Sequence, residues 1–479
     1  MADRRPALAL GLIVVAYVAL GWLYATRVPK WNAPDEPAHF NYVRHLATTH
    51  TLPILQPGDY DFQKVEERMA AKFPDRLPVD WMCYESHQPP LYYALAAPVY
   101  LLVARLPVEG QVVALRMLST VLGALGLIVA YLLAREVFPK DVGLALAVSG
   151  VMAFIPMRVA MYAAVENDAL AELVLSAVLL ALVVGLRRRP RPAGDLLVGA
   201  LLGLALLTKV VAYTAVALVG VAFVLAELLP SRRIAAEDTA LTPTLSPSER
   251  ETSSRPPRPW AAARDESILT PVRGRIKRLI GRLALVYGVA AVLSGWWFVR
   301  NALVYGGLDV FGLQRHAAVV EGQPLTGALT PAAVQRFAVI AFRSFWAQFG
   351  WMGILVDERI YLLLAVLCGA AVLGLVLYVG RVAASPDVLS AHQRRALALL
   401  ALNAALVGAG VVAYNVTFLQ AQGRYFFPAL PSLALLLVLG LRELLAEEHA
   451  GLLLGLLSAA LFGLTLLSLF RYVIPAFAQ

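Results

Sequence analysis

Long apolar stretches separated by shorter polar ones run through the whole chain. Two of them, residues 7–25 and 452–470, carry no charged side chain and are long enough to cross the ~30 Å hydrocarbon core of a bilayer at ~1.5 Å per residue. The runs are continuous, whereas the strands of a transmembrane β-barrel would show short alternating segments. The pattern therefore predicts an all-α protein, a polytopic bundle of transmembrane helices.

About eleven such runs, to within one or two, satisfy the rule that Lys and Arg gather in cytoplasmic loops. Arg4 and Arg5 place the N-terminus in the cytoplasm, so the first run is expected to be an uncleaved signal anchor. A shorter, proline-containing stretch at 90–106 is expected to lie on the outer surface, because a span there would put Arg187 to Arg189 outside. The expected spans are about 6–25, 113–134, 142–164, 169–186, 195–208, 211–229, 283–299, 360–380, 396–414, 429–445 and 451–470.

These spans form two membrane modules separated by an insertion. Residues 1–230 make the N-terminal module, which includes a long extracytoplasmic loop at 26–111. Residues 231–282 are basic and have a Pro/Ser/Thr-rich middle, so we expect a largely disordered cytoplasmic insertion near anionic lipid. The C-terminal module comprises residues 283–479, with extracytoplasmic loops at 301–357 and 415–428 in which we expect interfacial helices.

Composition and charge narrow the class of protein further. Hydrophobic residues make up 59% and charged residues 15% of the 479, against ~45–50% and ~25% in soluble domains, which excludes a soluble enzyme with one large core. The net charge of +9 would suggest a nucleic-acid partner for a soluble protein, but here it sets the topology, so no nucleic acid is expected. Cys83, in a polar loop, and Cys368, in an apolar run, are not expected to form a disulfide or a metal cluster.

Polar side chains of chemical interest lie at the outer ends of the expected helices, so we expect them to line one outward-facing cavity. Asp35 and Glu36 stand between Pro34 and Pro37, which stiffen the backbone at a helix N-terminus that favours ionised carboxylates. A rigid, ionised carboxylate suits a general base or a metal ligand, and the alternative is a plain N-cap. The other candidates are His39, Glu85, His87, Glu166, Asn167, Asp168, Lys209, Arg300, Arg424 and Tyr425.

Several of these candidates also have an ordinary structural explanation. Glu85 and His87 fit a solvated turn, and Asn167 with Asp168 fits a helix cap. Lys209, which has almost no loop around it, fits a snorkelling lysine as well as a phosphate contact. Arginine binds phosphate in a bidentate manner but is also common at membrane interfaces.

The combination of motifs is more informative than any one of them. A long outer loop that opens with Asp35-Glu36, followed by His87-Gln-Pro-Pro-Leu-Tyr-Tyr93 and then Asn167-Asp168 at the fourth helix, resembles the GT-C glycosyltransferases. These are integral membrane enzymes that use polyprenyl-phosphate sugar donors. Residues 35–182 are similar to the shared N-terminal module of that superfamily. Pro34 to Phe40 and Gln422 to Tyr425 resemble an uncharacterised bacterial branch, the DUF2142-like and family-39-like proteins.

The resemblance implies roles for several of these residues. Asp35 matches the catalytic carboxylate that activates an acceptor hydroxyl, and Glu36 completes the pair by positioning the acceptor or a metal. Asp168 matches an acidic position at the outer end of the fourth helix, and Lys209 a basic one between the next two helices. The superfamily is divided on metal dependence, so Mg²⁺ or Mn²⁺ held by Asp35, Glu36 and Asp168 stays open.

The predicted activity is an inverting glycosyl transfer, of a hexose or a pentose, at the extracytoplasmic face of a plasma (inner) membrane. The donor would be a polyprenyl-phosphate-linked sugar with its tail in membrane lipid, and its phosphate would rest on Lys209 or Arg424. The acceptor would be a glycan, a lipid or a protein. A transporter or flippase of a lipid-linked or anionic substrate is the alternative, because buried charge and broken helices also suit transport.

Overall fold

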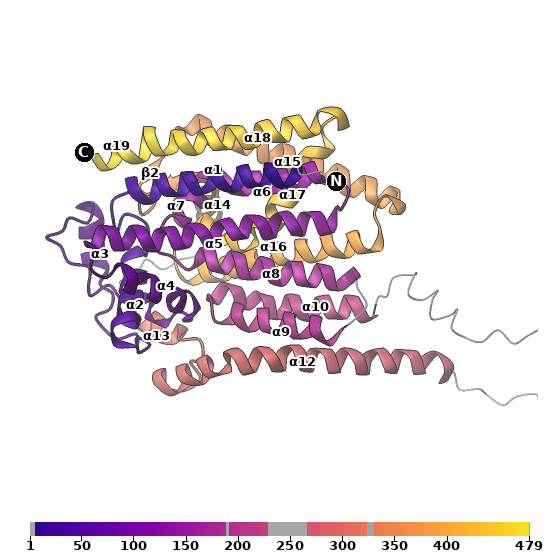
Figure 1. Ribbon diagram of the computed structural model, residues 1–479, viewed down its shortest axis with the longest axis horizontal. Coiled ribbons are helices and arrows are strands. Elements are labelled where there is room, and N and C mark those ends of the chain that lie inside the picture. The colour runs from indigo at the N-terminus through magenta and orange to yellow at the C-terminus, as the bar shows by residue number, and fades with distance from the viewer. Residues whose placement is uncertain (1–4, 188–190, 229–265, 323–329, 479) are drawn as a thin grey trace, which may run out of the picture.

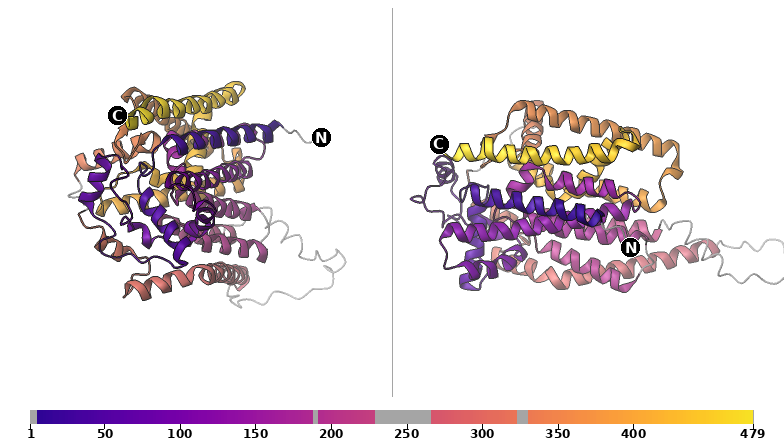
Figure 2. Two further views of the ribbon diagram at one scale, coloured as in Figure 1. Left: turned by 60° about the vertical axis from the view of Figure 1, so that its left-hand side comes forward. Right: turned by 45° about the horizontal axis from the view of Figure 1, so that its top comes forward.

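The computed structural model describes residues 5–187, 191–228, 266–322 and 330–478, and in these it is almost entirely helical. The long helices lie side by side in one bundle, with α12 (Glu266–Tyr305) and α18 (Glu447–Leu467) on opposite sides (Figure 1, Figure 2). The only strands in this part of the chain are the two-residue β1 (Gln348–Phe349) and β2 (Ile354–Leu355), which pair as an antiparallel hairpin. The predicted all-α class is therefore confirmed.

All eleven predicted spans are helical, over somewhat different bounds. Nine segments of the described chain are long and apolar enough to cross a membrane. A tenth is a pair of helices bent by 63° before Pro156. The remaining predicted span, 195–208, corresponds to the short apolar helix α9. The helices concerned are α1 (Arg5–Arg27), α5 (Val108–Val137), α6 (Val142–Ala153) with α7 (Pro156–Tyr162), α8 (Asp168–Arg187), α9 (Pro192–Leu206), η2 (Val210–Tyr213) with α10 (Thr214–Leu228), α12, α15 (Glu358–Ala384), α16 (Ala391–Thr417), η5 (Gly423–Ala429) with α17 (Leu430–Glu443), and α18 with η6 (Ser468–Val473) and α19 (Ile474–Ala478).

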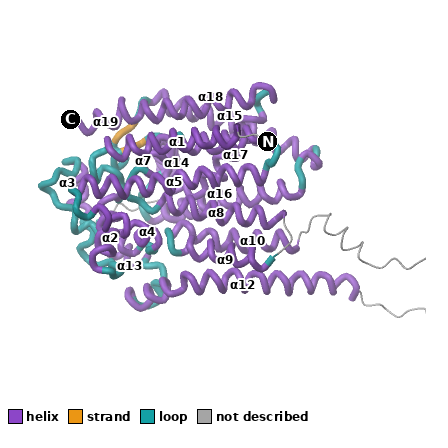
Figure 3. Tube along the Cα trace, viewed as in Figure 1, coloured by secondary structure: helices purple, strands orange, loops and turns teal. Residues whose placement is uncertain are grey.

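The longer loops gather at one end of the bundle, which we call the loop end: the end that carries residues 28–90, 306–322 and 330–357 (Figure 3). Helix α1 ends there, and α19 lies at the same end, so the two chain termini are at opposite ends of the bundle (Figure 1). The short helices of the loop end are α2 (Glu36–Thr49), α3 (Phe62–Ala70), η1 (Tyr84–His87), α4 (Leu91–Val103), α13 (Leu313–Val319) and α14 (Pro331–Trp346).

Helix α12 corrects the predicted boundary of the insertion. Residues 266–282 are helical and continuous with the span, where disorder was expected. Within this helix Arg282 pairs with Asp195 at 2.7 Å and with Glu227 at 2.8 Å, so it ties the start of the predicted span to α9 and α10. Residues 229–265, the rest of the predicted insertion, lie outside the described residues.

Candidate active site

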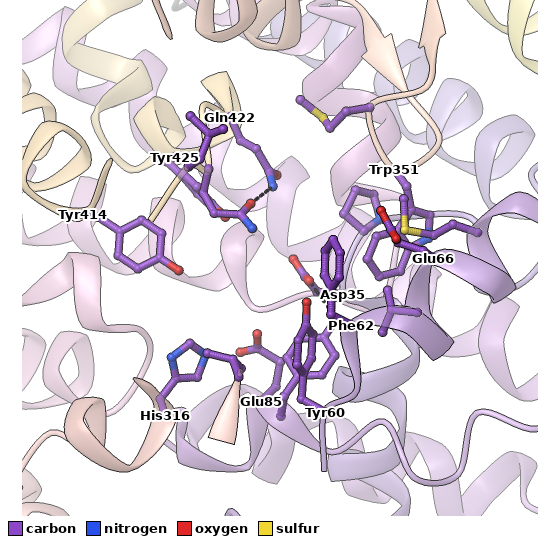
Figure 4. A pocket seen from close by; sticks show the side chains of 18 residues that line it. Asp35, Tyr60, Phe62, Glu66, Glu85, His316, Trp351, Tyr414, Gln422 and Tyr425 are labelled. Carbon is purple, nitrogen blue, oxygen red and sulfur yellow. Dashed lines mark hydrogen bonds between the residues drawn. The ribbon is translucent and has the colours of Figure 1, made fainter. Parts of the chain in front are cut away.

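A cavity of about 260 Å³ opens at the loop end, among segments that are far apart in the sequence (Figure 4). Its walls come from the start of α2, the first long loop with α3 and η1, the end of α13, the turn of the β1–β2 hairpin, the end of α16 and η5. The lining side chains include Asp35, Tyr60, Phe62, Glu66, Tyr84, Glu85, His316, Trp351, Tyr414, Gln422 and Tyr425. The lining is thus a mixture of acidic and aromatic groups.

Asp35 is held at the edge of this cavity by an unusual local backbone. It is the residue before α2 and has φ of 65°, a left-handed conformation that is uncommon for a residue with a side chain. Pro37 occupies the first turn of α2, where a missing N–H does no harm. One carboxylate oxygen of Asp35 accepts a hydrogen bond of 2.9 Å from the Tyr84 hydroxyl, and the other pairs with Arg424. The side chain of Asp35 is therefore fixed while it still faces the cavity.

Glu36, the next residue, points into the protein and is fully buried. Its two oxygens accept hydrogen bonds from Arg116 at 2.7 and 2.6 Å and from the backbone N–H groups of Trp31 and Val165. The other N–H groups of Arg116 bind backbone carbonyls at the end of α1 and in the residues after it. This geometry does not fit the expected catalytic role, because Glu36 does not line the cavity and has no free acceptor position.

Behind Asp35 lies a network of buried charges. Arg424 bridges Asp35 and Glu166, and its Nε donates to Gln422 at 2.7 Å. Glu166 also pairs with Lys209 at 3.2 Å. Gly423 makes this position of Arg424 possible, because a Cβ there would lie 2.2 Å from backbone atoms of α14.

His39 and Asp168 complete that network. His39 Nε2 lies 3.1 Å from Glu166, while its Nδ1 lies 2.7 Å from the Tyr93 hydroxyl. Asp168 accepts from Lys209 at 2.6 Å, and its second oxygen has no hydrogen-bond partner. Asn167 lies beside them, with its amide 3.4 Å from the carbonyl of Thr208.

Burial and neighbouring charges shift the pKa values of the groups in the loops. Burial raises the pKa of Glu85, and the nearby charge of His39 only partly opposes this. Burial also pushes the pKa of Glu166 upward, but His39, Lys209 and Arg424 together hold it well below its usual range. Burial lowers the pKa of His316 to about 4, so this ring is neutral at pH 7. The cavity is therefore lined by Asp35 and a carboxyl group of weakened acidity, next to a neutral imidazole.

The structure distributes the predicted site residues among three places. Asp35, Glu85 and Tyr425 line the cavity. His39, Glu166, Asn167, Asp168, Lys209 and Arg424 lie in and beside the charge network. The others lie elsewhere: Glu36 pairs with Arg116, and the ring of His87 lies tilted against that of His316 with 4.3 Å between the ring centres. Arg300 binds the carbonyl of Pro53 and lies over the ring of Trp297.

The expected metal set of Asp35, Glu36 and Asp168 does not fit a shared ion. Each carboxylate pairs with a different cation, namely Arg424, Arg116 and Lys209. Within the described residues, no group of three or more His, Cys, Asp or Glu side chains is arranged to hold a metal. No step of a mechanism is therefore assigned to Mg²⁺ or Mn²⁺.

Sequence reasoning missed three cavity residues and one interior partner. Tyr84 holds Asp35, while His316 and Trp351 reach the cavity from the second long loop, and Arg116 binds Glu36. Arg116 lies within an apolar run, and a charge at that depth is costly enough to signal a partner. His316 and Trp351 carry no such signal, because only the fold brings their loop to the cavity.

Comparison with known proteins gives a match to one family model over part of the chain, and a shared fold. Residues 87–242 match the family model described as dolichyl-phosphate-mannose-protein mannosyltransferase, and no curated protein matches the chain. The structure resembles apo ArnT from Cupriavidus metallidurans, with a TM-score of 0.52 and 17% identity over 92% of this chain and 61% of that one.

Two further structures have similar scores. ArnT from Cupriavidus metallidurans bound to undecaprenyl phosphate gives a TM-score of 0.50 with 16% identity, over 99% of this chain and 74% of that one. The apo oligosaccharyltransferase of Archaeoglobus fulgidus gives 0.50 with 13% identity, over 99% of this chain and 55% of its own. The chain thus spans only part of the length of the proteins it resembles. The family match and the shared architecture confirm the resemblance that the motifs indicated: the chain has the transmembrane fold of the GT-C glycosyltransferases.

Proposed function

We propose that the protein is an inverting glycosyltransferase that moves a sugar from a polyprenyl-phosphate donor to an acceptor hydroxyl. The observation that carries this proposal is the position of Asp35, a carboxylate fixed at the edge of a cavity at the loop end. The match of residues 87–242 to a mannosyltransferase family supports it. So does the likeness to ArnT, whose structure was solved with undecaprenyl phosphate bound.

In this proposal Asp35 is the general base. It takes the proton of the acceptor hydroxyl as the oxygen attacks C1 of the donor sugar from the face opposite the phosphate. The C1–O bond to the lipid phosphate breaks, and its electron pair leaves with the phosphate, so the configuration at C1 inverts. Such a displacement requires one positioned base and electrostatic support for the leaving group, and it requires no strong acid.

Arg424 supplies the electrostatic support through an exchange of partners. All three of its guanidinium nitrogens are engaged, by Gln422, Glu166 and Asp35. The incoming phosphate takes the place of Asp35 on Arg424, since a charge-assisted hydrogen bond between arginine and phosphate is a strong one. The same exchange releases the Asp35 carboxylate toward the acceptor hydroxyl, so donor binding and activation of the base are linked.

Lys209 acts indirectly, through Glu166. Its amine is bracketed by Glu166 and Asp168, and it does not line the cavity. It therefore compensates Glu166 and so keeps Arg424 available for the phosphate. The earlier expectation that Lys209 touches the phosphate directly gives way to this indirect role.

The sidedness of the reaction is part of the same proposal. Arg187 ends α8, Arg191 precedes α9, and Arg278 pairs with Glu227 near the end of α10. These helix ends lie opposite the loop end (Figure 1), and a concentration of Arg and Lys marks the cytoplasmic side. The cavity then opens on the extracytoplasmic side of the plasma membrane.

Transfer from an undecaprenyl-phosphate-linked sugar by the purified protein tests the proposal. Asp35→Asn should lower the rate of lipid-phosphate release at least about 100-fold, because the asparagine amide cannot accept the proton. Asp80→Asn is the matched control, since Asp80 is an exposed carboxylate of the same loop that pairs with Arg44 outside the cavity. A rate above about a tenth of wild type in Asp35→Asn would remove Asp35 as the base. Movement of the donor across vesicles without any release of lipid phosphate would favour the transporter alternative.

A further inference from the structure

The charge of the cavity lining limits what the cavity binds. Three carboxylic residues, Asp35, Glu66 and Glu85, are among its eighteen lining residues, and none of those eighteen is a lysine or an arginine. The nearest cation, Arg424, is buried behind Asp35 and already paired with two carboxylates. Apart from the point where Arg424 can be reached, the cavity therefore disfavours anionic groups and favours hydrogen-bond donors.

Glu85 offers an unused acceptor to such a donor. Its side chain is 9% exposed, and Oε2 is buried without any hydrogen-bond partner. The carboxyl group points into the cavity between His316 and Asp35 (Figure 4). Buried polar atoms are nearly always partnered in folded proteins, so a carboxyl group that lines a cavity and has an unpartnered oxygen indicates a ligand group that completes it.

Trp351 supplies a rigid aromatic surface on another wall. It occupies the turn of the β1–β2 hairpin, where Trp351 and Met352 both have positive φ, at 50° and 68°. Its indole N–H donates to the carbonyl of Trp31 at 2.8 Å, and its ring stacks on Phe73 at 5.6 Å. Strained backbone that is held by several contacts is typical of ligand sites.

A sugar ring fits these features together. Its hydroxyl groups are hydrogen-bond donors for Glu85, and the apolar C–H face of the ring packs against an aromatic side chain such as Trp351. A phosphate or a uronate would meet three acidic side chains instead, while a peptide would offer no comparable set of hydroxyl donors.

We propose that Glu85 and Trp351 form the acceptor subsite, and that it takes an uncharged, polyhydroxylated sugar unit, so that the acceptor hydroxyl belongs to a glycan. This inference rests on the proposed function, because it assigns the acceptor of that reaction. The sugar unit is recognised in the same way in a free oligosaccharide and in the head group of a glycolipid.

Sugar binding can be measured without any transfer. We would titrate the purified protein with matched neutral and uronate trisaccharides of hexoses, with a neutral pentose trisaccharide and with a Ser/Thr-rich peptide, and follow tryptophan fluorescence. A neutral trisaccharide should bind at least about tenfold more tightly than its uronate counterpart. Tighter binding of the uronate or of the peptide, or no response to any neutral sugar, would overturn the proposal.

Substitutions of Trp351 and Glu85 test whether the fluorescence response comes from sugar bound at the proposed subsite. Trp351→Ala and Glu85→Gln should each weaken binding of the neutral trisaccharide about tenfold, whereas Trp351→Phe, which keeps an aromatic ring, should stay within about threefold. Trp81→Ala and Glu67→Gln are the matched controls, because both residues belong to the same loop and neither lines the cavity. If Trp351→Ala does not fold, Trp351→Phe and Glu85→Gln decide: unchanged binding in Glu85→Gln would contradict the proposal.

Two further results separate this inference from the proposed function. Sugar binding that depends on Trp351, in a protein that never releases lipid phosphate, would leave the subsite intact and remove the transfer reaction. Asp35-dependent release of lipid phosphate with no preference for neutral sugars would do the reverse. Comparison of a free trisaccharide with a glycolipid that carries the same head group then identifies the source of the acceptor.

Discussion

Two neighbouring carboxylates, Asp35 and Glu36, lie in contrasting surroundings. The side chain of Asp35 is 24% exposed and faces the cavity, whereas that of Glu36 is fully buried. Asp35 is held by one tyrosine and by Arg424, which in the proposed reaction exchanges Asp35 for the donor phosphate. Glu36 is held by Arg116, whose Nε and both terminal nitrogens are all engaged, and by two backbone N–H groups. A substrate in the cavity can therefore reach Asp35 but not Glu36. We call Asp35–Arg424 the open pair and Glu36–Arg116 the closed pair.

The difference shows that buried charge alone does not indicate chemistry. The pair of Glu36 and Arg116 joins the end of α1 to the start of α2, and so it fixes the segment on which Asp35 stands. Arg158 and Glu172 form another fully buried pair, between α7 and α8, that does not line the cavity. Access to a cavity and a partner that can leave distinguish Asp35 from both of these structural pairs.

Breaking the closed pair should give the largest effect on stability. Arg116→Met leaves Glu36 buried without its cation, which typically costs about 3–5 kcal/mol. We expect a markedly lower thermal midpoint in detergent and a low yield of monodisperse protein, while Arg105→Met, at an exposed position nearby, should behave like wild type. An unchanged midpoint in Arg116→Met would contradict the structural role given to Glu36.

Breaking the open pair should instead reduce donor binding. Arg424→Met should weaken the apparent donor affinity about 10- to 150-fold, the range for a lost hydrogen bond to a charged group. Lys209→Met should have a smaller effect, and the double variant should lose less than the sum, because both cations pair with Glu166. Donor titrations measure these effects. Unchanged affinity in both single variants would move the phosphate site elsewhere, with Arg300 as the next candidate.

The smallest expected effect is a change with pH in the stability that His39 contributes to the charge network. Burial acts to lower the pKa of His39, but the adjacent Glu166 carboxylate outweighs it, so the net shift of this pKa is upward. A raised pKa stabilises the fold below the pKa of the unfolded chain, and this contribution is lost as the pH rises through the folded value. The difference in thermal midpoint between wild type and His39→Gln should therefore be larger at pH 6 than at pH 9. A difference that grows with pH would mean that His39 is neutral in the folded protein.

Most of the fold could be predicted from the sequence, because a bilayer imposes its thickness on every span. Two deviations remain: α12 begins before the predicted span, whose start Arg282 ties to Asp195 and Glu227, and the third span bends before Pro156. Because each span has to cross the bilayer once, the order of the apolar runs also predicted that the longer loops lie at one end of the bundle.

The site was predictable only in part. Asp35 could be singled out because Pro34 and Pro37 bracket it, but its separation from Glu36 depends on Arg116, 80 residues away from Glu36. The partner of Asp35, Arg424, is 389 residues distant. Trp351 and Glu85 likewise meet one cavity only after folding. Spacing along the chain contains no information on such contacts.

A cryo-electron microscopy map of the protein with undecaprenyl phosphate would test the central claim most directly. We expect density for the phosphate against Arg424, with the Asp35–Arg424 pair broken and the Asp35 carboxylate turned toward the cavity. Phosphate density away from Arg424, with the Asp35–Arg424 pair intact, would contradict it.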